Sequence, residues 1–213
     1  MRLLARLSGI LDAPVLALGR AASFLFIPLM LVIVYDVVQR KITGSSPGFT
    51  GTIFYIPSTL LQELEWHIHG VLFLLVLGYV YLHNAHVRIE IVRERLSPRA
   101  KIWLELAGIV LLLMPFCAFG VTYGWSFAER AYMTNEVSSA QGGLPARWII
   151  KSFIPIGFAL LAASGLSMLL KCVVRLRDPA ARLANDAALG TEHEIPAGES
   201  LEPLLPHDER GGR

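Results

Sequence analysis

The stretch EWHIHGVLFLLVLGYVYLHNAHVR, residues 65–88, decides the fold class, because no Lys, Arg, Asp or Glu lies between its two end residues. An α-helix needs about 20 apolar residues to cross the roughly 30 Å hydrocarbon core of a bilayer. The apolar residues are continuous here, whereas a strand of a membrane barrel would alternate apolar and polar side chains. The stretch therefore predicts a transmembrane helix over about residues 65–86.

Three other stretches have the same character and predict transmembrane helices over about residues 21–39, 102–125 and 149–171. The 213-residue chain is 54% hydrophobic and only 17% charged, whereas soluble domains carry about a quarter charged residues. We therefore expect an all-α membrane protein with one four-helix transmembrane domain over residues 21–175. The net charge of +2 is too small to indicate a nucleic-acid partner.

The two ends of the chain differ from this domain. Asp12 and Arg20 interrupt the apolar part of residues 1–20, and no small-x-small site follows, which argues against a signal peptide. This end predicts an amphipathic segment on the cytoplasmic surface that continues into the first transmembrane helix. Residues 176–213 are rich in Ala, Glu, Pro and Gly, which is typical of a disordered cytoplasmic tail.

Lys and Arg are unevenly distributed around the predicted helices. One side carries 12 of them, within residues 2–20, 88–101 and 171–182, and the other side carries five, within residues 40–41 and 130–151. Because basic residues are enriched on the cytoplasmic side, both termini are expected to be cytoplasmic.

Short interfacial helices are expected between the transmembrane helices. Residues 89–96 mix Ile, Val and Leu with Arg, as in a helix that lies on the membrane surface. Ser97 followed by Pro98 has the form of an N-cap and a first helical residue, so the third long helix should begin there.

Four histidines suggest a different class of protein, a haem-binding electron-transfer subunit of the membrane. His67, His69, His83 and His86 all lie in or beside the second predicted helix, and the other three predicted helices contain none. A haem held by two histidines usually takes them from facing helices. We therefore expect no haem, metal or other cofactor, and the haem-binding subunit is kept as the alternative.

Charged residues avoid the middle of the predicted helices. Asp36 precedes Arg40 by four residues, a spacing that allows an ion pair on one helix face. Secondary transporters usually have a midplane site between broken helices in matching halves, and Pro28, Pro115 and Pro155 do not form such a pair. The pattern favours a scaffold or accessory subunit over a complete transporter or an enzyme.

Small residues indicate two faces for helix packing. Gly120 and Gly124 have small-xxx-small spacing in the third predicted helix, and Ala159, Ala163 and Ser167 have it in the fourth. Such spacing lets two membrane helices approach closely.

Three segments form an ordered pattern from the second to the fourth predicted helix. QELEWH at residues 62–67 opens the second helix, and HVRIEI at 86–91 closes it. The third segment comprises EVS at 136–138, GLP at 143–145, Trp148, Lys151 and IPIGF at 154–158. With the four-helix topology, this pattern resembles the small permease subunit of tripartite ATP-independent periplasmic (TRAP) transporters, although that family often has Asp where Glu90 stands.

The resemblance implies a small, non-enzymatic scaffold subunit in the bacterial inner membrane. Its partners would be a large multi-span permease subunit and a periplasmic substrate-binding protein, and an ion gradient would drive uptake of an organic acid. It also implies ten subunit-interface residues, for each of which a local structural role is the alternative. Glu63, Trp66 and His67 would pack against the large subunit or orient the outer end of the second helix; His86, Arg88 and Glu90 would fix the inner elbow; Ser138, Pro145, Trp148 and Lys151 would shape the outer loop facing the periplasmic protein.

Overall fold

The computed structural model describes residues 2–83, 96–140 and 143–177, and within these ranges all regular structure is helical. The expected interfacial helix at 89–96, the residues His86, Arg88 and Glu90, and nearly all of the C-terminal tail lie outside the described residues. The expectation of an all-α membrane protein is confirmed. The helical segments long and apolar enough to cross a membrane are Leu3–Ser45, Ser58–Leu82, Arg99–Met133 and Trp148–Arg177.

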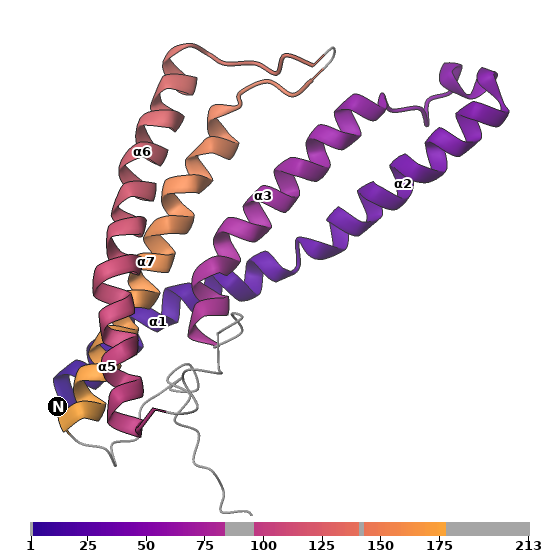
Figure 1. Ribbon diagram of the computed structural model, residues 1–213. Coiled ribbons are helices and arrows are strands. Elements are labelled where there is room, and N and C mark those ends of the chain that lie inside the picture. The colour runs from indigo at the N-terminus through magenta and orange to yellow at the C-terminus, as the bar shows by residue number, and fades with distance from the viewer. Residues whose placement is uncertain (1, 84–95, 141–142, 178–213) are drawn as a thin grey trace, which may run out of the picture.

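The described residues form the following helices and helical turns (Figure 1). They are α1 (Arg2–Ser23), α2 (Phe26–Ser45), the 3₁₀ turn η1 (Pro47–Gly51), α3 (Ser58–Leu82), α5 (Pro98–Gly108), the π-helical turn η2 (Ile109–Leu113), α6 (Met114–Met133) and α7 (Trp148–Arg177). The connections of residues 46–57 and 134–147 lie at the same end of the bundle, which we call the loop end.

The membrane segment Arg99–Met133 lies in one long helix in which the hydrogen-bond register changes locally. It begins as expected at Pro98, and the hydroxyl of Ser97 accepts a hydrogen bond from the Ala100 amide at 3.4 Å. Because proline has no N–H, the helical hydrogen-bond ladder is interrupted at Pro115. The π turn η2 lies directly before this residue and joins α5 to α6.

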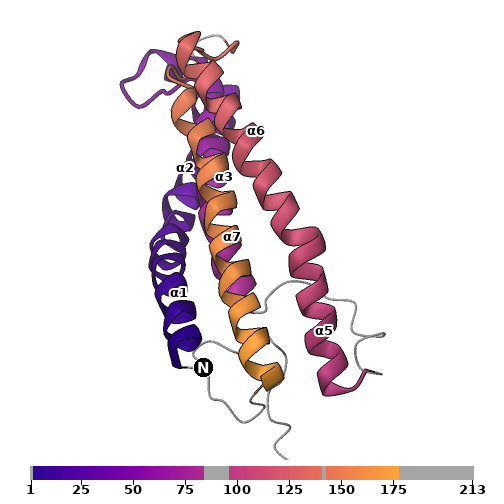
Figure 2. The same ribbon diagram turned by 90° about the vertical axis from the view of Figure 1, so that its left-hand side faces the viewer.

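Helix α7 is the centre of the bundle and packs against α1, α3 and α6. Figure 2 shows α1 on one side of α7, and α5 with α6 on the other. Glycines permit the close contact with α3. A Cβ added at Gly157 would lie 2.7 Å from the carbonyl oxygen of Leu74, and one added at Gly78 would lie 2.9 Å from that of Leu160.

The expected packing face on the third long helix is confirmed. A Cβ added at Gly120 would lie 2.4 Å from Cγ of Phe158, and one at Gly124 would lie 3.2 Å from the backbone nitrogen of Pro155. Both glycines therefore bring α6 into direct contact with α7. On α7, Ser167 contacts α1 instead, as described below.

Helix α1 packs along α3 and α7. Its buried positions recur every three or four residues and are Ser8, Asp12, Val15, Gly19 and Ala22. The side chains of Leu3 and Ile10 on another face are 69% and 66% exposed. Helix α1 thus places two polar and three small or apolar residues against the bundle and leaves large apolar side chains uncovered.

Candidate functional site

Glu63 ties the first turns of α3 to the loop of residues 134–147. Its Oε1 accepts a hydrogen bond from the Ser138 hydroxyl, and its Oε2 accepts one from the Leu144 amide at 2.6 Å. Gly143 leaves room for this contact, since a Cβ there would lie 2.5 Å from Cβ of Ser138 and 2.8 Å from Oε2 of Glu63. Four members of the sequence pattern, Glu63, Ser138, Gly143 and Leu144, therefore meet at this point, and Pro145 follows in the same loop.

Glu136 ties the same loop to the start of α7. It forms an ion pair with the Lys151 ammonium, and Arg147 Nε lies 3.9 Å from its other carboxylate oxygen. The Lys151 ammonium also lies 3.9 Å above the ring of Phe127, a cation–π contact. The side chain of Lys151 is only 12% exposed, so its partners lie within this chain.

Trp148 begins α7 and closes the loop end on the α6 side. Its ring meets that of Tyr132 edge to face, with ring centroids 5.4 Å apart. This is a favourable geometry for two aromatic rings.

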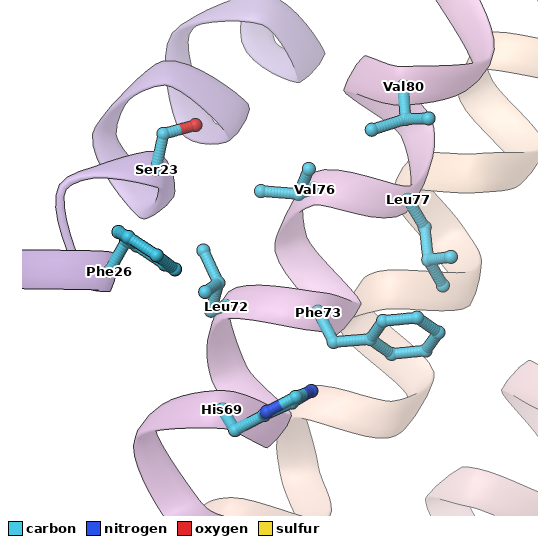
Figure 3. A pocket seen from close by; sticks show the side chains of 8 residues that line it. All are labelled: Ser23, Phe26, His69, Leu72, Phe73, Val76, Leu77 and Val80. Atoms are coloured by element: carbon cyan, nitrogen blue, oxygen red, sulfur yellow. The ribbon is translucent and has the colours of Figure 1, made fainter. Parts of the chain in front are cut away.

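A second feature lies on the other face of α3, which the remaining helices leave open. It is a trough, lined by Ser23, Phe26, Leu29, Ile33, Gln62, Glu65, Trp66, His69, Gly70, Leu72, Phe73, Val76, Leu77 and Val80. Figure 3 shows its half nearer the α1–α2 turn, where Ser23 and Phe26 face Leu72 and Val76 of α3. His69 and Phe73 line both halves, so the two halves adjoin along α3. Trp66 and Phe73 are 65% and 57% exposed.

The histidines of α3 are separated from one another. Nδ1 of His67 lies against the backbone carbonyl of Glu63, one turn earlier, whereas His69 lines the trough. His83 stacks on Tyr79 at the far end of the helix. Within the part of the chain that the structure describes, no three His, Cys, Asp or Glu side chains gather as they would around a metal ion.

Residues 29–175 match the family model described as tripartite ATP-independent periplasmic transporters, DctQ component. The chain belongs to this family. The match covers more than half of the 213 residues and confirms the resemblance to the small TRAP permease subunit. No curated protein and no solved structure matches the chain.

Membership of the DctQ family makes the chain a multi-pass membrane component of a transporter, and the family is not known as an enzyme family. It favours the transporter over the haem-binding alternative. The structure brings Glu63, Ser138, Pro145, Trp148 and Lys151 together at the loop end, whereas Trp66 lines the trough.

The sequence analysis missed one buried polar cluster of this DctQ-family chain. Lys171 Nζ of α7 donates to Oδ2 of Asp12 in α1 at 2.8 Å, and the Ser167 hydroxyl donates to Oδ1 at 2.6 Å. Both charged side chains are at most 2% exposed. The cluster holds α1 against α7. Helix α1 itself lies before the residues matched by the family model, which begin at residue 29 in α2.

Lys171 was counted among the basic residues that flank the membrane helices, and the structure corrects this interpretation. Its ammonium is buried against Asp12, so it is not a free charge at the membrane surface. The available signal was the single acid that interrupts the apolar part of residues 1–20, one helical turn after Ser8. A buried acid requires a partner of opposite charge, but only the packing of the helices identifies Lys171 as the partner of Asp12.

The expected ion pair within α2 is present. Arg40 binds one carboxylate oxygen of Asp36, which is fully buried. One turn away, Gln39 uses both ends of its amide on the backbone of Ile56, at 2.6 Å and 2.9 Å. These contacts fasten the connection after α2 to the helix itself.

Proposed function

We propose that this chain is the small scaffold subunit of a TRAP-type transporter in the bacterial inner membrane, with both termini in the cytoplasm. It would support a large permease subunit during ion-gradient-driven uptake of an organic acid. A periplasmic binding protein would deliver that acid to the loop end of the bundle.

The trough is the observation from which we infer the surface that binds the large permease subunit. It extends along α3 from Gln62 to Val80, roughly 27 Å at 1.5 Å per helical residue. A helix that crosses the roughly 30 Å hydrocarbon core of a bilayer has about this length, so one membrane helix of a partner would fit along the trough. Helices associate in membranes through close packing and interhelical hydrogen bonds, and the trough offers Gln62, Glu65 and His69 among its apolar side chains.

The paired charges support a scaffold role. Glu63 and Glu136 are bound to the loop of residues 134–147 and to α7, and Asp12 is bound to Lys171. A side chain already engaged in this way is poorly suited to capture a substrate or a coupling ion. The contacts of Glu63 and Glu136 hold the loop end in one shape, as a docking platform for a soluble partner requires.

The test is co-purification of the large permease subunit with Trp66→Ala. A large exposed aromatic residue in the centre of an interface commonly contributes 2 kcal/mol or more, so recovery of the large subunit should fall about tenfold or more. Uptake by cells that express the complex should fall with it.

The matched control is Trp103→Ala. Trp103 is 59% exposed, similar to Trp66, but lies on α5, away from the trough. Equal recovery of the large subunit with wild type and Trp66→Ala, or equal loss in both variants, would refute the trough as the partner surface.

A further inference from the structure

A separate groove lies between α6 and α7 near the loop end. Its loop-end part contains three aromatic side chains and one acid, Trp125, Glu129 and Tyr132 of α6 and Trp148 of α7. Farther from the loops its walls are apolar and include Val121, Ile156 and Ala159. The groove is therefore amphipathic along its length.

Four polar side chains of this groove have no hydrogen-bond or ion-pair partner in the described part of the chain, whereas the Ser152 hydroxyl donates to the Trp148 carbonyl. The carboxylate of Glu129, the indole N–H groups of Trp125 and Trp148 and the hydroxyl of Tyr132 make no hydrogen bond or ion pair there. Two other acids at the same end, Glu63 and Glu136, are both paired. The groove thus presents one anionic acceptor and three donors a short distance apart.

The backbone and the rings give the groove a defined shape. The contact of Gly124 with Pro155 brings α6 and α7 close together beneath it. The edge-to-face contact of Tyr132 with Trp148 holds the aromatic rings at its end. Trp and Tyr favour the membrane–water interface, so the loop-end part lies at the depth of lipid headgroups and the apolar part at that of acyl chains.

We propose that this groove binds a phospholipid with a zwitterionic ammonium headgroup, a phosphatidylethanolamine. The ammonium donates to Glu129 and lies against the aromatic rings, which attract cations. The lipid phosphate accepts hydrogen bonds from the indole and phenol donors, and an acyl chain lies along Val121 and Ile156. An anionic phosphatidylglycerol headgroup offers no cation to Glu129 and is repelled by it.

The test measures lipids retained by the purified full-length chain after reconstitution in vesicles of equal phosphatidylethanolamine and phosphatidylglycerol, by native mass spectrometry. The wild-type chain should retain phosphatidylethanolamine preferentially. Glu129→Gln should lower this retention about tenfold, as expected from loss of one charge-assisted hydrogen bond, and should raise retention of phosphatidylglycerol, because the charge that repels its headgroup is removed. Trp125→Phe, which keeps the ring and removes the N–H donor, should give a smaller loss.

The matched control is Glu65→Gln, an acid near the same end of the bundle that lines the trough instead. Unchanged phosphatidylethanolamine retention in Glu129→Gln, or an equal loss in Glu65→Gln, would overturn the proposal. Loss of the large subunit from Glu129→Gln with unchanged lipid retention would overturn it too, because the occupant would then be a protein helix. The lipid measurement needs no partner, so its result does not depend on the proposed function.

Discussion

At the scale of single residues, the most consequential contact is the buried pair of Asp12 and Lys171. The two residues are separated by 159 positions, and each charge is removed from solvent. A desolvated charge is tolerable only with a partner of opposite sign and further hydrogen bonds. Ser167 supplies one such bond to Asp12, so the pair specifies how α1 lies on α7.

Replacing Asp12 with Leu should destabilise the protein strongly, because Lys171 would be left as a buried charge without its counterion. We expect a loss of about 3–5 kcal/mol in the free energy of unfolding, measured by denaturation in detergent. The double variant Asp12→Leu with Lys171→Met should recover most of this loss. A double variant less stable than the single one would contradict the assignment of the pair as the source of the effect.

A second important single residue is Glu63, which binds the loop of residues 134–147 through two hydrogen bonds. In Glu63→Gln, the side-chain amide can no longer accept from both Ser138 and the Leu144 amide. The lost hydrogen bond to a charged group costs about 1.5–3 kcal/mol. Hydrogen exchange at the Leu144 amide should therefore become at least about tenfold faster. Glu65→Gln, two residues away on a different face, should leave this rate unchanged; equal acceleration in both variants would argue against the clamp.

At the scale of elements, α7 organises the bundle through small residues rather than large ones. Gly157 meets the backbone of α3, while Gly120 and Gly124 of α6 meet Phe158 and Pro155 of α7. Close approach of backbones increases van der Waals contact, which is a main source of helix association in a bilayer. The three helices are therefore sensitive to added volume at particular glycines.

Gly157→Ala should test this sensitivity. The new methyl group would collide with the Leu74 carbonyl, a backbone atom that cannot rotate away. We expect a loss of about 1–3 kcal/mol in the free energy of unfolding. Gly108→Ala is the control, because a Cβ there meets nothing within 4 Å; alanine in that helix should be neutral or stabilising by up to about 1 kcal/mol. Similar losses in both variants would argue against the α3–α7 contact as the source of the effect.

At the scale of the whole molecule, the bundle has two chemically different ends and two different faces. The loop end is fastened by Glu63 and Glu136, whereas the opposite end contains the Asp12–Lys171 pair. The trough lies beside α2 and α3, and the second groove lies between α6 and α7. A partner helix, a soluble protein and lipid can thus each meet a separate part of the surface.

The proposed orientation predicts which end of the bundle is accessible from outside the cell membrane. A membrane-impermeant maleimide should label Ser139→Cys at the loop end in cells with a permeabilised outer membrane. It should label Arg99→Cys, at the other end, only after the inner membrane is opened. The native Cys117 and Cys172 are 1% and 0% exposed and should give little background. The reverse labelling pattern would invert the proposed topology.

Much of this fold was predictable because it depends on local properties. The uninterrupted apolar run after Glu65, the helix start at Ser97 and Pro98, and the pairing of Asp36 with Arg40 all follow from neighbouring residues in the sequence. The pattern around residues 62–67 and 136–158 likewise indicated the DctQ family, which the family match confirms.

The partners of Asp12 and Glu63 could not be predicted in the same way. Asp12 binds residues 155 and 159 positions away, and Glu63 binds residues 75 and 81 positions away. No local spacing relates such residues, because the contact exists only after the helices have packed.

The sequence by itself therefore determined the four apolar membrane segments and the family, since hydropathy and an ordered motif are properties of the chain alone. Only the tertiary structure decided that α1 is bound to α7 by a buried ion pair, that Glu63 holds the 134–147 loop and that Trp66 lies in an open trough. The physical reason is that burial, desolvation and surface shape depend on which helix faces meet.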